Sequence, residues 1–142
     1  MKDSDVRYLV DTGPLVAAFN RTDAWHEWAE STFLTIAEPF WTSESVITET
    51  AWNLGENSAA AREVLAAVGQ GVIRILPVVA SGAFRLAELM AKYERMDVCD
   101  GSLVVLSEKF PRAKILTVDF RDFPVYRRFG DEPLPLLMPE KT

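Results

Sequence analysis

The stretch that decides the fold lies near the N-terminus, where residues 6–15 read Val-Arg-Tyr-Leu-Val-Asp-Thr-Gly-Pro-Leu. Its first five residues are mostly β-branched or aromatic, which favours a strand. The strand stops at Asp11, and Pro14 suits the first turn of a helix because an N–H at that position would have no helical partner. Residues 6–15 therefore predict a strand that ends in an acidic loop and leads directly into a helix.

Strands and helices alternate along the rest of the chain. Apolar residues at spacings of three and four predict helices over residues 24–36, 44–54, 58–68, 79–93 and 97–108. Thr22 or Asp23 is the expected cap of the first of these helices, and Ser43 is the expected cap of the second. Apolar runs predict strands at residues 72–76 and 114–118, and the proline-interrupted run at 134–138 is at best a strand at a sheet edge.

This order of elements predicts a single α/β domain in which a mostly parallel central sheet carries helices on both faces. The chain has 142 residues, 49% of them hydrophobic, which is about the size of one domain with one core. It contains no internal repeat, low-complexity tract or domain linker. We expect one domain over residues 1–142, with its core at about residues 6–129 and a short proline-rich tail at 130–142.

Composition excludes several classes of protein. Cys99 is the only cysteine, so the chain can form neither an internal disulfide nor a cysteine-rich zinc site. No apolar run approaches the ~20 residues that span a bilayer. The acidic start of the chain is unlike a signal peptide. We therefore expect a soluble protein that stays in the cytoplasm.

The charge balance constrains the kind of partner. The chain carries 15 Lys and Arg against 21 Asp and Glu, a formal net charge of −6. This balance disfavours a protein that binds nucleic acid through a broad basic surface. Carboxylates that hold a divalent metal ion reverse the local sign, however, so an acidic chain can still bind phosphate at a metal site.

Two aspartates follow the first and the last clear strands. Asp11 and Asp119 should lie on one rim of the sheet, because right-handed crossovers place the carboxyl ends of parallel strands together. Taken singly, each has a simpler interpretation, Asp11 as a helix cap and Asp119 as the start of a turn. Together on one rim they favour a site.

Three further acids lie on predicted helices. Asp97 and Asp100 share a helix face, and we assign capping to Asp97 and a site position to Asp100, although the roles could be exchanged. Glu49 lies between apolar pairs, where a glutamate is usually just solvated. Oxygen ligands without an accompanying cluster of His or Cys suit Mg²⁺ or Mn²⁺ rather than zinc.

Four segments in order, residues 10–15, 48–50, 96–104 and 116–123, resemble the acidic motifs of the PIN-domain ribonucleases, and within them the VapC-type toxins of bacterial toxin–antitoxin pairs. The resemblance runs from about residue 6 to residue 129. It implies a PIN-like fold and Mg²⁺- or Mn²⁺-dependent hydrolysis of RNA phosphodiester bonds. It also implies a cognate antitoxin protein and a homodimer.

The resemblance also assigns residues. It implies that one or two metal ions are held by a catalytic quartet, Asp11, Glu49, Asp100 and Asp119. It implies accessory roles for Thr12, Asp97 and Asp122. The sequence departs from the common pattern at Cys99, where a small residue is usual. We expect Cys99 to pack away from Asp100 and to be no nucleophile.

The remaining conspicuous residues favour structural roles. We expect His26 to have a structural role and to be partly exposed, and the tryptophans to lie in the core or at an interface. Arg121, Arg127 and Arg128 are expected to be solvated charges, with phosphate steering as the alternative. A phosphatase that needs a second aspartate two residues after the first is disfavoured, because Gly13 stands there. A non-catalytic PIN-like binding module and a housekeeping PIN nuclease stay open as alternatives.

Overall fold

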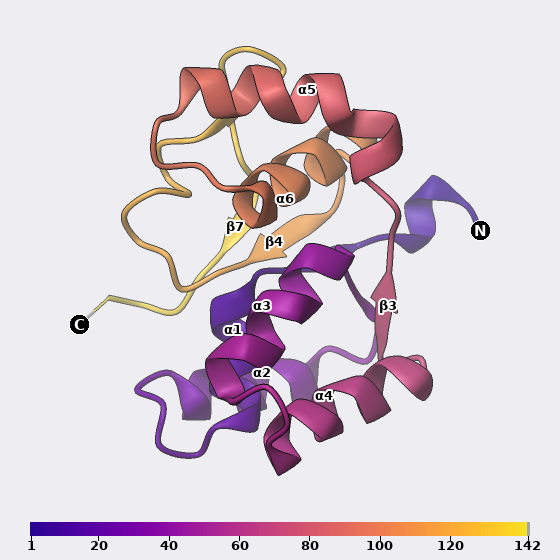
Figure 1. The fold of residues 1–142 in the computed structure, drawn as a ribbon, viewed down its shortest axis with the longest axis vertical. Coiled ribbons are helices and arrows are strands. Elements are labelled where there is room, and N and C mark those ends of the chain that lie inside the picture. Colours follow the sequence, from indigo (N-terminus) through magenta and orange to yellow (C-terminus); the bar gives the residue numbers. More distant parts are fainter. Residues whose placement is uncertain (142) are drawn as a thin grey trace.

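The computed structural model describes residues 1–141, which fold around a five-stranded sheet with the order β3-β2-β1-β4-β7 (Figure 1). All of its strand pairs are parallel. The strands are β1 (Tyr8–Val10), β2 (Phe40–Thr42), β3 (Ile73–Ile75), β4 (Lys114–Leu116) and β7 (Leu136–Leu137). A separate antiparallel pair is formed by β5 (Arg127–Arg128) and β6 (Glu132–Pro133).

The helices lie between the strands, as the alternating pattern predicts. They are α1 (Thr12–Phe19), α2 (His26–Thr35), α3 (Glu44–Leu54), α4 (Ala59–Gly69), α5 (Val79–Lys92) and α6 (Val98–Lys109), preceded by a short 3₁₀ turn at Asp3–Asp5. Successive residues of a strand point to opposite faces, and both Leu9 and Val10 of β1 are fully buried. Helices therefore cover both faces of the sheet, and the predicted α/β fold is confirmed.

Most predicted helix starts are confirmed by their caps. Ser43 accepts a hydrogen bond from Val46 N at the start of α3, and Asp97 accepts one from Asp100 N at the start of α6. The prediction for α2 is wrong in detail, because this helix begins at His26 after an N-cap, Trp25, whose side chain makes no capping bond. Asp23 instead accepts a hydrogen bond from Trp25 N, which holds the chain in a turn before the helix.

Helix α6 is buried along much of its length. It packs between the sheet and α5, and Leu103, Val104 and Leu106 are almost completely buried. A Cβ atom at Gly101 would lie 2.9 Å from Leu86 Cδ2 on α5, so the two helices approach more closely there than a larger residue allows. This packing fixes the start of α6, which carries Asp97 and Asp100, relative to the sheet.

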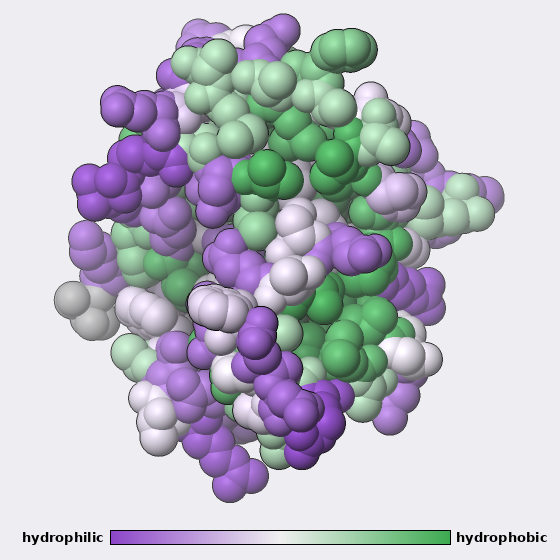
Figure 2. Space-filling model, viewed as in Figure 1, coloured by the Kyte–Doolittle hydropathy of each residue, from purple (hydrophilic) through white to green (hydrophobic). Residues whose placement is uncertain are grey.

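The surface is mixed in character. Figure 2 shows apolar residues gathered in patches on the face that carries α3 and α5, separated by polar residues. Phe84 on α5 is 95% exposed, and Trp52 on α3 is 66% exposed. Trp41, in contrast, is buried beneath the Arg74 guanidinium. Within residues 1–141, no helix combines the length and apolar character that crossing a membrane requires.

Candidate active site

Asp11 lies at the point where β1 passes into α1. Its backbone N–H donates to Leu116 O of β4 at 2.9 Å. One carboxylate oxygen accepts a hydrogen bond from Thr12 N, and the other accepts one from Thr117 Oγ1, both at 2.8 Å. Burial raises the pKa of Asp11 to about 6; these two hydrogen bonds oppose the rise, and the negative charges of Asp119 and Glu49 add to it.

Thr117 connects Asp11 to Asp119. Its hydroxyl donates to Asp11 and accepts a hydrogen bond from Asp119 N at 3.0 Å. Asp119 Oδ1 in turn accepts the N–H groups of Arg121 and Asp122, at 2.9 and 2.8 Å. The turn role expected of Asp119 is therefore present together with its position on the rim, and this turn fixes one carboxylate oxygen.

Asp100 comes from the first turn of α6, directly after the Asp97 cap. Its Oδ2 atom accepts a hydrogen bond from the Tyr126 hydroxyl at 2.7 Å. Burial raises the pKa of Asp100 to about 7, the Tyr126 bond opposes this, and the charges of Asp97, Asp11 and Asp119 add to it. Two aspartates with raised pKa values on one rim indicate a crowded acidic site.

These side chains surround one hollow of about 320 Å³. Glu49 reaches it from α3, and the hollow is lined by Asp11, Glu49, Asp100 and Asp119 together with Thr12, Gly13, Val16, Asp23, Trp25, Asn53 and Val118. Gly13 allows a close approach, since a Cβ atom there would lie 2.5 Å from Val118 Cγ2. The fold thus brings together four acids that span more than a hundred residues of sequence.

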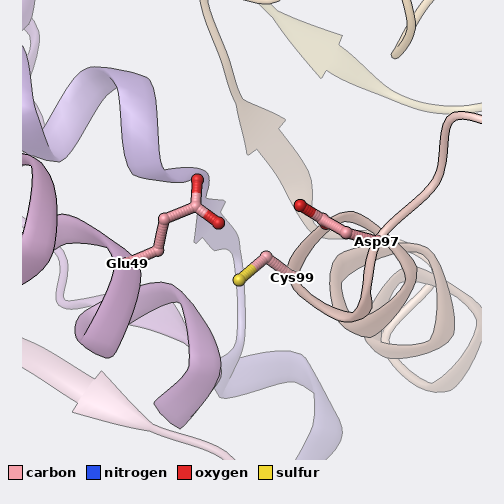
Figure 3. Close-up of side chains that lie close together, drawn as sticks. All are labelled: Glu49, Asp97 and Cys99. Atoms are coloured by element: carbon pink, nitrogen blue, oxygen red, sulfur yellow. The ribbon is translucent and has the colours of Figure 1, made fainter.

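Cys99, on α6, lies between Glu49 of α3 and Asp97 (Figure 3). One ligand atom from each of Glu49, Asp97 and Cys99 falls within 4.8 Å of the others. The thiol donates to Ser45 O at 3.3 Å, and burial together with the neighbouring Glu49 carboxylate raises its pKa. Cys99 therefore packs, as predicted, but it packs against two of the acids, and its raised pKa disfavours a nucleophilic thiolate.

The residues of the hollow fit a divalent cation. Four carboxylates supply the hard oxygen ligands that Mg²⁺ and Mn²⁺ prefer. The Thr12 hydroxyl is buried and has no hydrogen-bond partner among residues 1–141. A buried hydroxyl normally has a partner, so this one fits an additional ligand or a water molecule beside the carboxylates.

Other predicted residues lie outside this hollow. His26 Nδ1 lies 2.7 Å from Ala17 O, a contact that holds α2 on α1, and its Nε2 lies 3.3 Å from Glu30 within α2. These contacts agree with the structural role expected of His26. Asp122 pairs with Arg95, with Nε and Oδ1 2.9 Å apart, so its carboxylate is already engaged.

The basic cluster is not simply solvated. Arg128 is buried and donates to Glu132, to Ser107 O at 2.7 Å and to Pro111 O at 3.1 Å. The expectation of solvated charge is therefore wrong for Arg128. Each of its three guanidinium nitrogens already donates to a group within the protein, which disfavours a role in phosphate steering. Of the three arginines, Arg121 is the exposed one.

Sequence reasoning missed two residues of the site, Thr117 and Tyr126. Thr117 stands two positions before Asp119, a spacing at which a hydroxyl can accept the aspartate's N–H, so a local signal was available. Tyr126 stands 26 positions after Asp100 and carries no local signal. Trp25 also lines the hollow, and its ring centroid lies 5.6 Å from that of Phe120.

The comparison with known protein families covers the part of the chain that forms this site. Residues 8–128 match the family model described as the PIN domain. The chain belongs to the PIN-domain family. The PIN-domain family is a family of nucleases, and all residues that line the acidic hollow lie within the matched segment. No curated protein matches the chain.

A solved structure also resembles this PIN domain. VapC20 of Mycobacterium tuberculosis, described as a sarcin-ricin loop cleaving toxin, superimposes with a TM-score of 0.62 at 22% sequence identity. The match covers 76% of this chain and 86% of VapC20. At this identity the likeness shows that the two proteins share a fold.

Proposed function

We propose that this PIN domain is a Mg²⁺- or Mn²⁺-dependent endoribonuclease. The observation that carries the proposal is the single hollow in which Asp11, Glu49, Asp100 and Asp119 meet beside the unpartnered hydroxyl of Thr12. Such a set of oxygen ligands has no use in a purely structural core, because like charges at close range are costly unless a cation shares them. Membership of a nuclease family supports the same assignment.

Each acid has a proposed role. Asp11, Asp100 and Asp119 would hold the cation directly, and Glu49 would either bind it or orient a water molecule. When bound, one or two divalent cations would supply an activated water molecule and a stabilising charge for the leaving oxygen. Thr117 and the turn after Asp119 keep the aspartates in place. Asp97 and Asp122 stay as proposed accessory acids.

The acidic composition agrees with this chemistry. Two divalent ions would contribute +4 to the formal charge of −6, leaving −2, and the added charge would lie where a phosphate group must bind. The RNA backbone would then be attracted locally, although the protein as a whole is acidic.

We further propose that the chain is the toxin of a toxin–antitoxin pair and acts in the cytoplasm. The shared fold with VapC20 supports this assignment. A cognate antitoxin would place an arginine among the acids, because a guanidinium pairs with carboxylates in bidentate fashion. An apolar hollow between α1, α2 and α4, lined by Leu15, Phe19, Phe33, Leu34 and Phe40 among others, suits an amphipathic segment of that partner. We also propose a homodimer, which the resemblance to the VapC-type toxins implies.

Cleavage of a labelled single-stranded RNA tests the nuclease. The wild type should cleave with Mg²⁺ or Mn²⁺ and stop when EDTA is added, whereas Asp11→Asn should lose the activity. Asp131→Asn is a matched control because Asp131 is exposed in the turn between β5 and β6, and this variant should cleave like the wild type. RNA binding by the wild type without cleavage would instead favour the non-catalytic binding module.

Expression in bacteria tests the toxin. Wild-type chain should halt growth, Asp11→Asn should not, and co-expression of the neighbouring small gene should restore growth. Normal growth in the presence of soluble, active wild-type protein would favour a housekeeping PIN nuclease.

A further inference from the structure

Tyr126 is a core residue whose polar end is directed at the acidic site. It is almost completely buried, and its ring packs against Tyr93 and Phe123 with centroids 5.1 and 5.3 Å away. The hydroxyl donates to Asp100 Oδ2 at 2.7 Å. Packing alone would be satisfied by phenylalanine, so the hydroxyl needs a different explanation.

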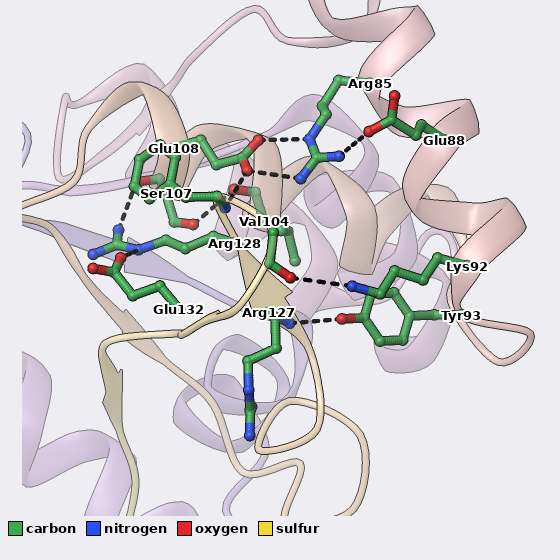
Figure 4. A network of polar contacts seen from close by, with 12 residues as sticks. Arg85, Glu88, Lys92, Tyr93, Val104, Ser107, Glu108, Arg127, Arg128 and Glu132 are labelled. Carbon is green, nitrogen blue, oxygen red and sulfur yellow. Dashed lines mark hydrogen bonds and ion pairs between the residues drawn. The ribbon is translucent and has the colours of Figure 1, made fainter.

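The chain around Tyr126 is held by several polar contacts. Tyr126 N donates to Asp122 O, and the Asp122 carboxylate pairs with Arg95. On the other side, Arg127 N donates to the Tyr93 hydroxyl, as Figure 4 shows. The Tyr126 phenol therefore cannot drift away from Asp100 without breaking these contacts.

The following residues anchor the same segment to α6 and α5 (Figure 4). Arg128 donates to Ser107 O of α6, and Phe129 N donates to Glu108. Glu108 also accepts two hydrogen bonds from Arg85 of α5, each at 2.9 Å. The segment that carries Tyr126 is thus tied to the helix that carries Asp100.

We propose that Tyr126 is a positioning residue for Asp100, its phenol occupying Oδ2 so that Oδ1 is the oxygen presented to the cation. This inference rests on the proposed function. A carboxylate with one fixed oxygen cannot rotate freely about its terminal torsion, which is otherwise broad and two-fold. Geometry held by such a neighbour is what a metal site needs for tight, oriented binding.

The test measures Mn²⁺ binding by isothermal titration calorimetry and RNA cleavage for wild type and Tyr126→Phe. The variant keeps the ring and its packing, so it should fold, and thermal unfolding checks this. Mn²⁺ affinity should fall about tenfold, because a hydrogen bond to a charged buried group is lost. The kcat of RNA cleavage should fall while KM for RNA stays the same.

Tyr93→Phe is the matched control. It removes a hydroxyl that bonds to Arg127 N rather than to an acid. The bonds of Arg128 and Phe129 still anchor the segment, so the Mn²⁺ affinity of Tyr93→Phe should stay close to that of the wild type. In an Asp100→Asn background, Tyr126→Phe should cause no further loss of affinity, because the two changes act through one contact.

The outcomes separate the two proposals. Wild-type affinity in a folded Tyr126→Phe protein, or an equal loss in Tyr93→Phe, would overturn the positioning role and leave the nuclease intact. An undiminished effect of Tyr126→Phe in the Asp100→Asn background would also overturn it, since the phenol would then act elsewhere. Failure of the wild type to bind Mn²⁺ would overturn both.

Discussion

Asp11→Asn should stabilise the metal-free protein at pH 8 even though it abolishes the proposed activity. Asp11 is buried, and its pKa is raised from 3.8 to about 6. Above pH 6 the folded protein therefore contains an ionised carboxylate that is less stable there than in the unfolded chain. Asparagine removes that charge at the same size, so the folded state should gain stability.

The magnitude follows from the pKa. A rise of about two pKa units costs about 3 kcal/mol of folding free energy once the group is ionised in both states. Asparagine keeps one acceptor oxygen and loses one of the two hydrogen bonds from Thr12 N and Thr117 Oγ1, which costs about 1 kcal/mol. The net gain is about 2 kcal/mol, or about 5 °C in Tm for a domain of this length.

The sign of the stability difference between Asp11→Asn and the wild type should reverse at acidic pH. As the pH falls from 6 to below 3.8, Asp11 is protonated in the folded state before it is protonated in the unfolded chain. The destabilisation of the wild type by the ionised carboxylate therefore disappears over this pH range. Below pH 3.8 only the lost hydrogen bond remains, and Asp11→Asn should be about 1 kcal/mol less stable than the wild type. Urea unfolding in EDTA at pH 8 and pH 3.5 measures both limits, with Asp131→Asn as the control that changes neither. A destabilised Asp11→Asn protein at pH 8 would refute the reasoning.

Three other outcomes are expected. Mg²⁺ or Mn²⁺ should raise the Tm of the wild type, because an ion that binds only the folded state stabilises it. Asp100→Asn and Asp119→Asn should each reduce that rise, and an equal rise in all three proteins would show that these acids are misassigned. Arg128→Ala should lower the urea-unfolding free energy by about 2 kcal/mol, against less than about 0.5 for the exposed Arg121→Ala. Iodoacetamide at pH 8 should label Cys99 slowly in the native protein and quickly in urea, since the raised pKa keeps the native thiol protonated; equal rates would contradict that environment.

Much of the fold was predictable because it depends on local patterns. The capping residues Ser43 and Asp97 stand directly before helical periodicity, and both caps are present. Parallel strands also have only one rim for their carboxyl ends, so the meeting of Asp11 and Asp119 follows from topology. The position of these two aspartates on the rim could therefore be predicted without knowing any side-chain contact.

The contacts that hold these acids could not be predicted in the same way. Arg128 follows another arginine in the sequence, and only the return of the chain at Glu132 and the carbonyl of Ser107 make its burial favourable. The start of α2 depends on a competition between capping and an Asp23 turn that local sequence does not decide. The sequence does not distinguish Tyr126 from other aromatic core residues, and only the structure places its hydroxyl beside Asp100.

The three aspartates differ in how the protein uses their oxygen atoms, and this difference bears on how a cation would bind. Asp11 has both oxygens engaged, whereas Asp119 is held through Oδ1 and Asp100 through Oδ2. Among residues 1–141, no hydrogen bond reaches the second oxygen of Asp119 or of Asp100. The protein therefore fixes each carboxylate while leaving defined lone pairs free. The folded chain bears the repulsion among the acids, and the cation of the proposed function would relieve it.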